Sequence, residues 1–215
     1  MTDVAHFLAS PPLTPSIQEI RRALDQSDLL GVIRNPDQKL APAAYQLDFK
    51  DAAVLIPIWK SAHDELYVLL TQRAKHMRNH PGQIAFPGGQ YDDTDSSIVQ
   101  TALRETEEEV GLAADCFNLL GELGDYLTIS GYCVRPILAE ITKSPKLTLC
   151  YDEVESVHWV PLNYLLTPAN YRFQERMVSN TPRAFFEIQY QDITIWGVTA
   201  GILYGLYQVL HAHSQ

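Results

Sequence analysis

The sequence lacks three features that mark membrane, nucleic-acid-binding and disulfide-stabilised proteins. Its 215 residues contain no run of 18 apolar residues, so no membrane-spanning helix is predicted. A formal charge of −10 argues against a nucleic-acid-binding surface. The three cysteines, Cys116, Cys133 and Cys150, are scattered and form no C-x-x-C pair, which argues against a disulfide framework and against a zinc site.

The N-terminus also lacks the basic segment and apolar run of a signal peptide, so the cytoplasm is the expected location. With 46% hydrophobic residues, the chain can bury one sizeable core. Residues 1–45 hold a Pro-rich stretch and a predicted helix at about 16–30, and they are interpreted as a helical N-terminal extension. Residues 46–215 are interpreted as one main domain.

Apolar patterning in the main domain predicts strands alternating with helices. Strands are expected at 52–59, 66–72, 83–86, 118–123, 134–142, 156–160, 185–190 and 192–195. One helix is expected to begin at an N-cap of Asp95 or Ser96 and to end at Gly111, and another is expected at 197–212. This order predicts an α/β fold with a mixed β-sheet between helices.

A group of acidic residues lies on the first of these helices, in the segment R-E-T-E-E-E-V-G-L at 104–112. Residues three and four apart share a helix face, so Glu105, Glu108 and Glu109 are predicted to lie side by side, with Glu107 pointing away. Carboxylates crowded in this way repel one another, which favours a cation between them. A solvated acidic helix face is the alternative interpretation.

A Gly-rich segment, F-P-G-G, precedes the acidic helix and ends at Gly88 and Gly89. Backbone amides in such a loop can approach phosphate oxygens. The surrounding stretch 71–90 contains no Asp or Glu but includes Arg73, Lys75 and Arg78. Carboxylates that can hold a hard cation, next to a loop that can accept phosphate, indicate metal-assisted attack on a phosphate ester or anhydride.

These residues resemble the signature of the Nudix hydrolases. The second half of the Nudix box fits at its fixed positions from Arg104 to Leu112, with Thr106 where an aliphatic residue is usual. The first half departs from the pattern, because Gly89 and Asp95 each lie one residue earlier than the box requires. The resemblance implies the Nudix fold, an α/β/α sandwich.

A second motif resembles that of the coenzyme A (CoA) pyrophosphatases within this family. Residues 69–89, L-L-T-Q-R-A-K-H-M-R-N-H-P-G-Q-I-A-F-P-G-G, fill every fixed position of the subfamily motif at the right spacing. The resemblance implies that Arg73 and Arg78 bind substrate together with Gly88 and Gly89. Solubilising charges on a loop are the alternative for the two arginines.

The resemblance also implies roles for the acidic residues. Glu105 and Glu109 are expected to ligate Mg²⁺ or Mn²⁺, and Glu108 is expected to be a ligand or to position water. Arg104 could orient one carboxylate through a bidentate pair, and a surface arginine is the alternative. Glu153 is the preferred additional ligand or base, and an ordinary loop acid is the alternative.

The expected reaction is therefore metal-dependent hydrolysis of the pyrophosphate in CoA or its derivatives, giving 3′,5′-ADP and 4′-phosphopantetheine or its acyl form. Two alternatives stay open at this stage: a Nudix enzyme for ADP-ribose, NADH or a nucleoside triphosphate, and a catalytically silent nucleotide sensor. A small-molecule substrate is the expected partner. The sequence leaves the oligomeric state open, a homodimer included.

Overall fold

The computed structural model describes residues 2–27, 31–33, 35, 37, 48–178 and 181–214. The proposed boundary between residues 45 and 46 lies outside the described residues, as does Leu30 at the end of the helix expected at 16–30. The described helices are α1 (Thr2–Leu8), α2 (Ile17–Asp25), α4 (Ile98–Val110), α5 (Leu162–Leu165) and α6 (Val198–Ala212). The described strands are β1 (Lys50–Lys60), β2 (Leu66–Arg73), β3 (Ile84–Ala85), β4 (Gly88–Gln90), β5 (Phe117–Glu122), β6 (Tyr126–Leu127), β7 (Tyr132–Ile141), β8 (Val154–Pro161), β9 (Tyr171–Val178), β10 (Thr181–Tyr190) and β11 (Ile193–Trp196).

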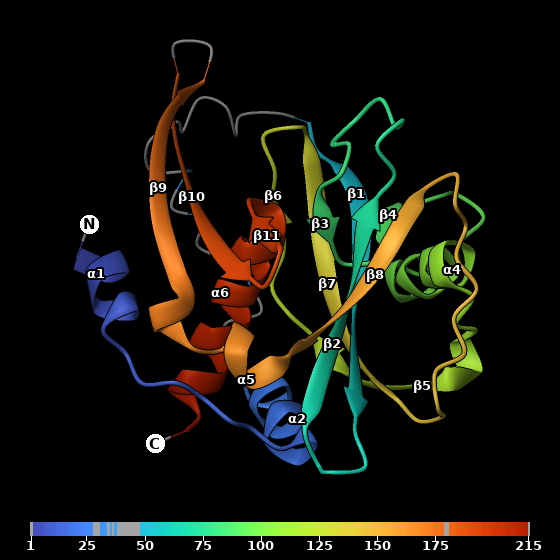
Figure 1. The fold of residues 1–215 in the computed structure, drawn as a ribbon, viewed down its shortest axis with the longest axis horizontal. Helices are drawn as coiled ribbons and strands as arrows, with labels where there is room; N and C mark the ends of the chain where they lie inside the picture. Colours follow the sequence, from blue (N-terminus) through green and yellow to red (C-terminus); the bar gives the residue numbers. More distant parts are fainter. Residues whose placement is uncertain are drawn as a thin grey trace.

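The larger sheet is mixed and has β1 near its centre (Figure 1). β1 runs parallel to β7 from the pair Lys50 and Tyr132 to the pair Trp59 and Ile141. On its other side β1 pairs antiparallel with β2 and β4, and β2 pairs in turn with β3 and β8. The short strand β4 is thereby fixed directly beside the centre of the sheet.

Both faces of β1 are buried, which identifies the arrangement as a sandwich. Successive side chains of a strand point to opposite faces. Ala53 and Leu55 pack with Ala102 of α4 on one face, while Ile56 and Ile58 join the larger core on the other. That larger core includes α6, so helices cover the sheet on both sides (Figure 1). The predicted α/β fold with a mixed sheet between helices is confirmed.

A separate three-stranded sheet, β9–β10–β11, packs onto the same larger core. The hairpin of β10 and β11 agrees with the strands expected at 185–190 and 192–195. β9 was not predicted, because Arg172, Glu175 and Arg176 interrupt its apolar pattern.

The N-terminal helices also contribute to the core. Phe7 of α1 is buried, with its ring centroid 4.6 Å from that of Tyr204 on α6. α2 begins with a capping box between Ser16 and Glu19, and it ends at Asp25, earlier than expected. Residues of the predicted extension therefore pack directly against the main domain.

All three cysteines are free and half-buried. None of the helices in the described ranges has the length and apolar character needed to cross a membrane.

Candidate active site

Helix α4 is positioned by caps at both ends. Ser97 is its N-cap, and the Ser97 side chain accepts a hydrogen bond of 3.2 Å from the amide of Gln100. The expectation of Asp95 or Ser96 at this position was wrong. Gly111 ends the helix in the left-handed conformation at φ 75°, where glycine has no steric penalty, as predicted.

Asp95 instead forms a forked ion pair with Arg104. The Arg104 Nε lies 2.9 Å from Asp95 Oδ1, and one terminal nitrogen lies 3.0 Å from Oδ2. The hydroxyl of Thr101 donates a further hydrogen bond of 2.9 Å to the same buried carboxylate. Arg104, followed by Thr101, holds the pKa of Asp95 well below its usual range despite burial. Sequence reasoning missed this ion pair. The feature of the sequence that could have indicated it is the position of Asp95, one residue earlier than the acid of the Nudix box.

Arg104 also reaches the acidic residues of its own helix. Its second terminal nitrogen donates to Glu105 Oε1 at 2.8 Å and to Glu108 Oε2 at 3.3 Å. Because Asp95 fixes the guanidinium, Arg104 can fix the orientation of Glu105 in turn. Burial raises the pKa of Glu105, and the Arg104 charge opposes that rise. The side chain of Glu108 is 58% exposed.

The two glycines of the F-P-G-G segment allow β4 to pass close to α4 and β1. A Cβ atom at Gly89 would overlap the carboxyl group of Glu105. At Gly88, where φ is +155°, a Cβ atom would overlap the carbonyl oxygen of Ala53 in β1. Glycine at position 89 therefore leaves space for the Glu105 carboxylate between the strand and the helix, and glycine at position 88 lets β4 lie against β1.

Glu109 is the most buried acid of the group, with 4% of its surface exposed. Its Oε2 atom is buried and has no hydrogen-bond partner. Burial raises the pKa of Glu109 to about 8. The charges of Glu153 and Glu105 add to the rise, while Arg73 and the amide of Gly88 oppose it. A buried carboxylate with an unsatisfied oxygen needs a cation or a donor to offset its desolvation.

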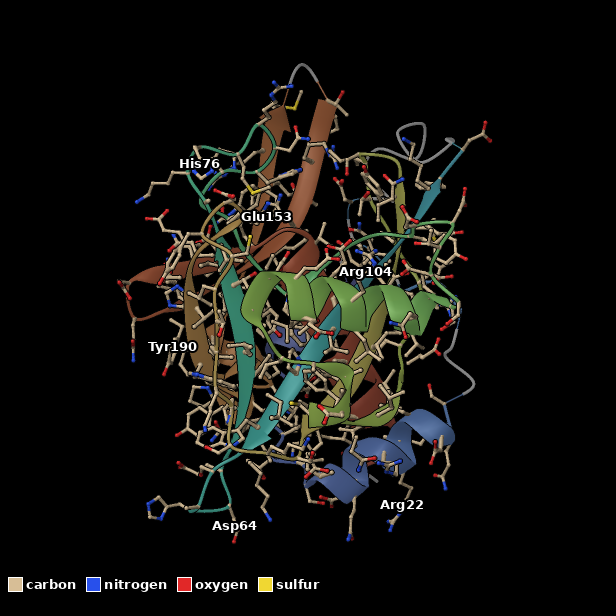
Figure 2. All side chains as sticks on the ribbon, turned by 90° about the vertical axis from the view of Figure 1, so that its right-hand side faces the viewer. Arg22, Asp64, His76, Arg104, Glu153 and Tyr190 are labelled. Atoms are coloured by element: carbon tan, nitrogen blue, oxygen red, sulfur yellow. The ribbon has the colours of Figure 1, made fainter. Side chains whose placement is uncertain are left out.

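Glu153 lies in an exposed turn that main-chain hydrogen bonds connect to the rest of the site. The amide of Cys150 donates to the carbonyl of Glu109 at 3.0 Å, and the amide of Glu153 donates to the carbonyl of Cys150 at 2.9 Å. The carbonyl of Glu153 accepts from the amide of Ala74 at 2.8 Å. Figure 2 shows Glu153 and Arg104 on the same side of α4.

Glu105 interacts electrostatically with Glu108, Glu109 and Glu153, and Glu108 stands at the exposed edge of this group, on the same Arg104 nitrogen as Glu105. Among the described residues, no three acidic, His or Cys side chains form a ready-made metal cluster. The donor set still fits a hard divalent cation, because it consists of carboxylate oxygens and one of them is buried without a partner. The assignment of Glu105, Glu108 and Glu109 as metal ligands stays a prediction.

The two arginines expected to bind substrate have different surroundings. Arg73 is half-buried at the end of β2, and its Nε atom is buried without a hydrogen-bond partner. Arg78 lies exposed in the following loop. Lys75 of the same loop forms an ion pair of 2.7 Å with Glu155, next to the turn that carries Glu153.

Residues 49–180 match the sequence model of the NUDIX domain, which covers more than half of the chain. The chain therefore belongs to the Nudix domain family. It is 38% identical over 157 residues to proteins named "Uncharacterized Nudix hydrolase NudL" from Escherichia coli O7:K1 and from Shigella boydii serotype 4. Each alignment covers 73% of this chain and 81% of the relative. A solved structure, a Caenorhabditis elegans Ap4A hydrolase in a binary complex, is 23% identical with a TM-score of 0.44, covering 52% of this chain and 80% of that one.

Proposed function

We propose that this Nudix hydrolase cleaves the pyrophosphate bond of CoA or a CoA derivative, releasing 3′,5′-ADP and 4′-phosphopantetheine or its acyl form. The observation that carries the hydrolytic assignment is the Glu109 carboxylate, which is buried beside Glu105 with one oxygen unpartnered. The motif at 69–89, which contains Arg73 and Arg78, supports CoA as the substrate.

Glu105 and Glu109 are the residues that would hold Mg²⁺ or Mn²⁺, with Glu108 available at the exposed edge. Such a cation, when bound, neutralises phosphate charge and lowers the pKa of water. Arg104 acts as a positioning residue, since it holds Glu105 while Asp95 holds Arg104. These contacts fix the orientation of one ligand before any substrate arrives.

Glu153 is proposed as the general base. It is exposed to solvent, and main-chain hydrogen bonds through Cys150 connect its turn to Glu109, which supports this role. A base in this position can take a proton from the attacking water and pass it to solvent. The hydrogen bond from the amide of Ala74 to the carbonyl of Glu153 fixes the turn against the loop with Arg78.

Arg78 is proposed to bind the 3′-phosphate of CoA. Its guanidinium is exposed, and in the part of the chain that the structure describes it has no ion pair within 4 Å. Loss of one charge-assisted hydrogen bond costs roughly 1.5–3 kcal/mol, or about 10- to 100-fold in affinity. Arg78→Ala should therefore lower kcat/KM for CoA by about that factor and spare dephospho-CoA, which lacks the 3′-phosphate.

The deciding experiment is a screen of CoA, acetyl-CoA, ADP-ribose and NADH with Mg²⁺, with the products separated by chromatography. CoA or acetyl-CoA is expected to be cleaved with the highest kcat/KM, and the product should be 3′,5′-ADP. Preferred cleavage of ADP-ribose or NADH would overturn the CoA assignment, but the assignment as a hydrolase would stand. Binding without turnover of any substrate would identify a sensor instead.

A further inference from the structure

Two oppositely charged side chains of the site each have a buried polar atom with no hydrogen-bond partner. These atoms are the Nε of Arg73 and the Oε2 of Glu109, and no other buried side-chain nitrogen or oxygen of the described residues lacks a partner. A buried polar group without a partner costs free energy, and a charged group costs more. Two such atoms in one site indicate that a further group belongs there.

The main chains that carry Arg73 and Glu109 are fixed. The amide of Arg73 donates to the carbonyl of Gln83, and the carbonyl of Arg73 accepts from the amide of Gly82, both at 3.0 Å. The pairing of β2 with β8 shifts register at Arg73. Glu109 lies in the last turn of α4, and its carbonyl accepts from Cys150. Both side chains are therefore carried by main chain that is hydrogen-bonded on either side of the site.

Arg73 and Glu109 are near each other but not in contact. The positive charge of Arg73 acts directly on Glu109 and opposes the effect of burial on its pKa. Among the described residues, however, no ion pair within 4.0 Å joins them, although Arg104 forms three such pairs nearby. Main-chain hydrogen bonds also connect the two elements, from Ala74 to Glu153, from Glu153 to Cys150 and from Cys150 to Glu109. Arg73 and Glu109 therefore belong to one part of the site, where one donor and one acceptor have no partner.

A group that satisfies both atoms must accept a hydrogen bond from Arg73 and must offer Glu109 a cation or a donor. A phosphate oxygen paired with a divalent cation has that arrangement of charge, whereas a phosphate alone would repel Glu109. We propose that Arg73 contacts the diphosphate of the substrate at the bond that is cleaved, not the 3′-phosphate. This inference rests on the proposed function only in requiring that the site acts on a diphosphate.

The contrast with Arg78 supplies a matched control. Both arginines belong to the same basic segment, but only Arg73 has a buried guanidinium atom and an electrostatic effect on Glu109. Arg73→Gln keeps the stem and a polar head while removing the charge, and Arg78→Gln makes the same change on the exposed loop. Arg73→Lys restores the charge without the planar fork.

The first measurement is the binding of imidodiphosphate, a diphosphate that is not hydrolysed, by calorimetry in the presence of Mg²⁺. Arg73→Gln should weaken its binding by about 10- to 100-fold, since one charge-assisted hydrogen bond is lost. Arg78→Gln should leave it unchanged, and Arg73→Lys should recover part of the loss. Unchanged binding in folded Arg73→Gln, or equal losses in both Gln variants, would overturn the inference.

The second measurement is the binding of Mn²⁺ alone, followed by electron paramagnetic resonance. Arg73→Gln removes a positive charge near Glu109, so Mn²⁺ should bind more tightly. A proton competes for the same carboxylate. When a neighbouring positive charge is lost, however, the electrostatic binding energy of a divalent ion improves by roughly twice as much as that of a proton. Weaker or unchanged binding of Mn²⁺ would show that the charge of Arg73 does not act on the carboxylate of Glu109. If Arg73→Gln does not fold, Arg73→Lys decides: unchanged affinity for imidodiphosphate in that variant overturns the inference.

These binding results are independent of whether CoA is the substrate. If the wild-type protein prefers ADP-ribose while Arg73→Gln loses affinity for imidodiphosphate, the CoA assignment fails and the role of Arg73 stands. If the protein prefers CoA while Arg73→Gln binds imidodiphosphate normally, the CoA assignment stands and the role of Arg73 fails. In kinetic assays, Arg73→Gln should affect CoA and dephospho-CoA equally, because both contain the same diphosphate.

Discussion

Gly89 on β4 and Glu105 on α4 lie so close together that any side chain at position 89 would overlap the Glu105 carboxyl group. The group that must move is the end of a flexible side chain, so the fold can adapt at little cost. The predicted metal ligand, however, would be displaced from its position against Arg104.

Gly89→Ala should therefore lower kcat by about 10-fold or more while changing the melting temperature little, since loss of ligand orientation costs about 10- to 100-fold. Gly31→Ala is the control, because a Cβ at position 31 meets nothing within 4 Å. Steady-state kinetics and thermal unfolding of both variants provide the check. A fully active Gly89→Ala enzyme would mean that the position of Glu105 is unimportant.

Glu105→Gln tests the metal assignment, because it keeps the shape of the side chain and removes its charge. Turnover should fall by about 100-fold or more through loss of a charged ligand. Folding should be retained or improved, since repulsion with neighbouring acids is relieved.

Activity of the wild-type protein should also disappear in a chelating buffer and return with Mg²⁺ or Mn²⁺. The exposed Glu107 supplies the control variant Glu107→Gln, and full activity after chelation would contradict the assignment.

Glu109 should make the stability of the metal-free protein depend on pH. Its pKa is raised to about 8 in the folded state from an ordinary value of 4.5, so the folded state binds this proton more tightly. The resulting stability is fully present below about pH 4.5 and is lost as pH rises through about 8. Between pH 5 and 9 the free energy of unfolding should therefore decline, on the scale of a few kcal/mol.

Denaturant titrations across that range, with chelator present, measure the decline. Glu109→Gln should remove the part of the pH dependence of the free energy of unfolding that Glu109 contributes. Glu107→Gln should leave that pH dependence unchanged. Asp95 does not disturb the comparison, because its lowered pKa keeps it ionised throughout this range. An identical slope in wild-type protein and Glu109→Gln would show that Glu109 is not the titrating group.

Asp95→Asn should be the most destabilising of these substitutions, because it leaves the fork of Arg104 without its charged partner. Breaking a fully buried pair costs about 3–5 kcal/mol, and the partial exposure of Arg104 reduces this to about 2–3 kcal/mol. Glu108→Gln, which removes the exposed partner of the same guanidinium, should cost less than about 1 kcal/mol. Equal midpoints of chemical denaturation for the two variants would contradict this order.

Much of the scaffold of the site could be predicted because it depends on local patterns. Continuous apolar runs identified β1 and β2, and Gly111 identified the end of α4. Helical periodicity placed Glu105, Glu108 and Glu109 on one side of α4. The burial of Glu109 could not be predicted from periodicity, because it depends on the approach of β4 and of the 147–150 segment, both of which are tertiary contacts.

The role of Asp95 was missed for a related reason. Asp is a favourable N-cap, so local propensity predicted a helix start at this position. In the structure the fork of Arg104, nine residues later, binds the Asp95 carboxylate, and Ser97 caps the helix. Likewise, β9 forms because a partner strand pairs with it, although its own sequence is rich in charge.

The segments around the site are joined by main-chain hydrogen bonds, from the amide of Cys150 to the carbonyl of Glu109 and from the amide of Ala74 to the carbonyl of Glu153. Such bonds do not depend on which side chains the linked residues carry. Residues 75–80 and 151–152 can therefore diverge during evolution without disturbing the acids that they surround. Substitutions in these loops should therefore change what the surface around Glu105 and Glu109 can bind while the main-chain connections to α4 stay intact.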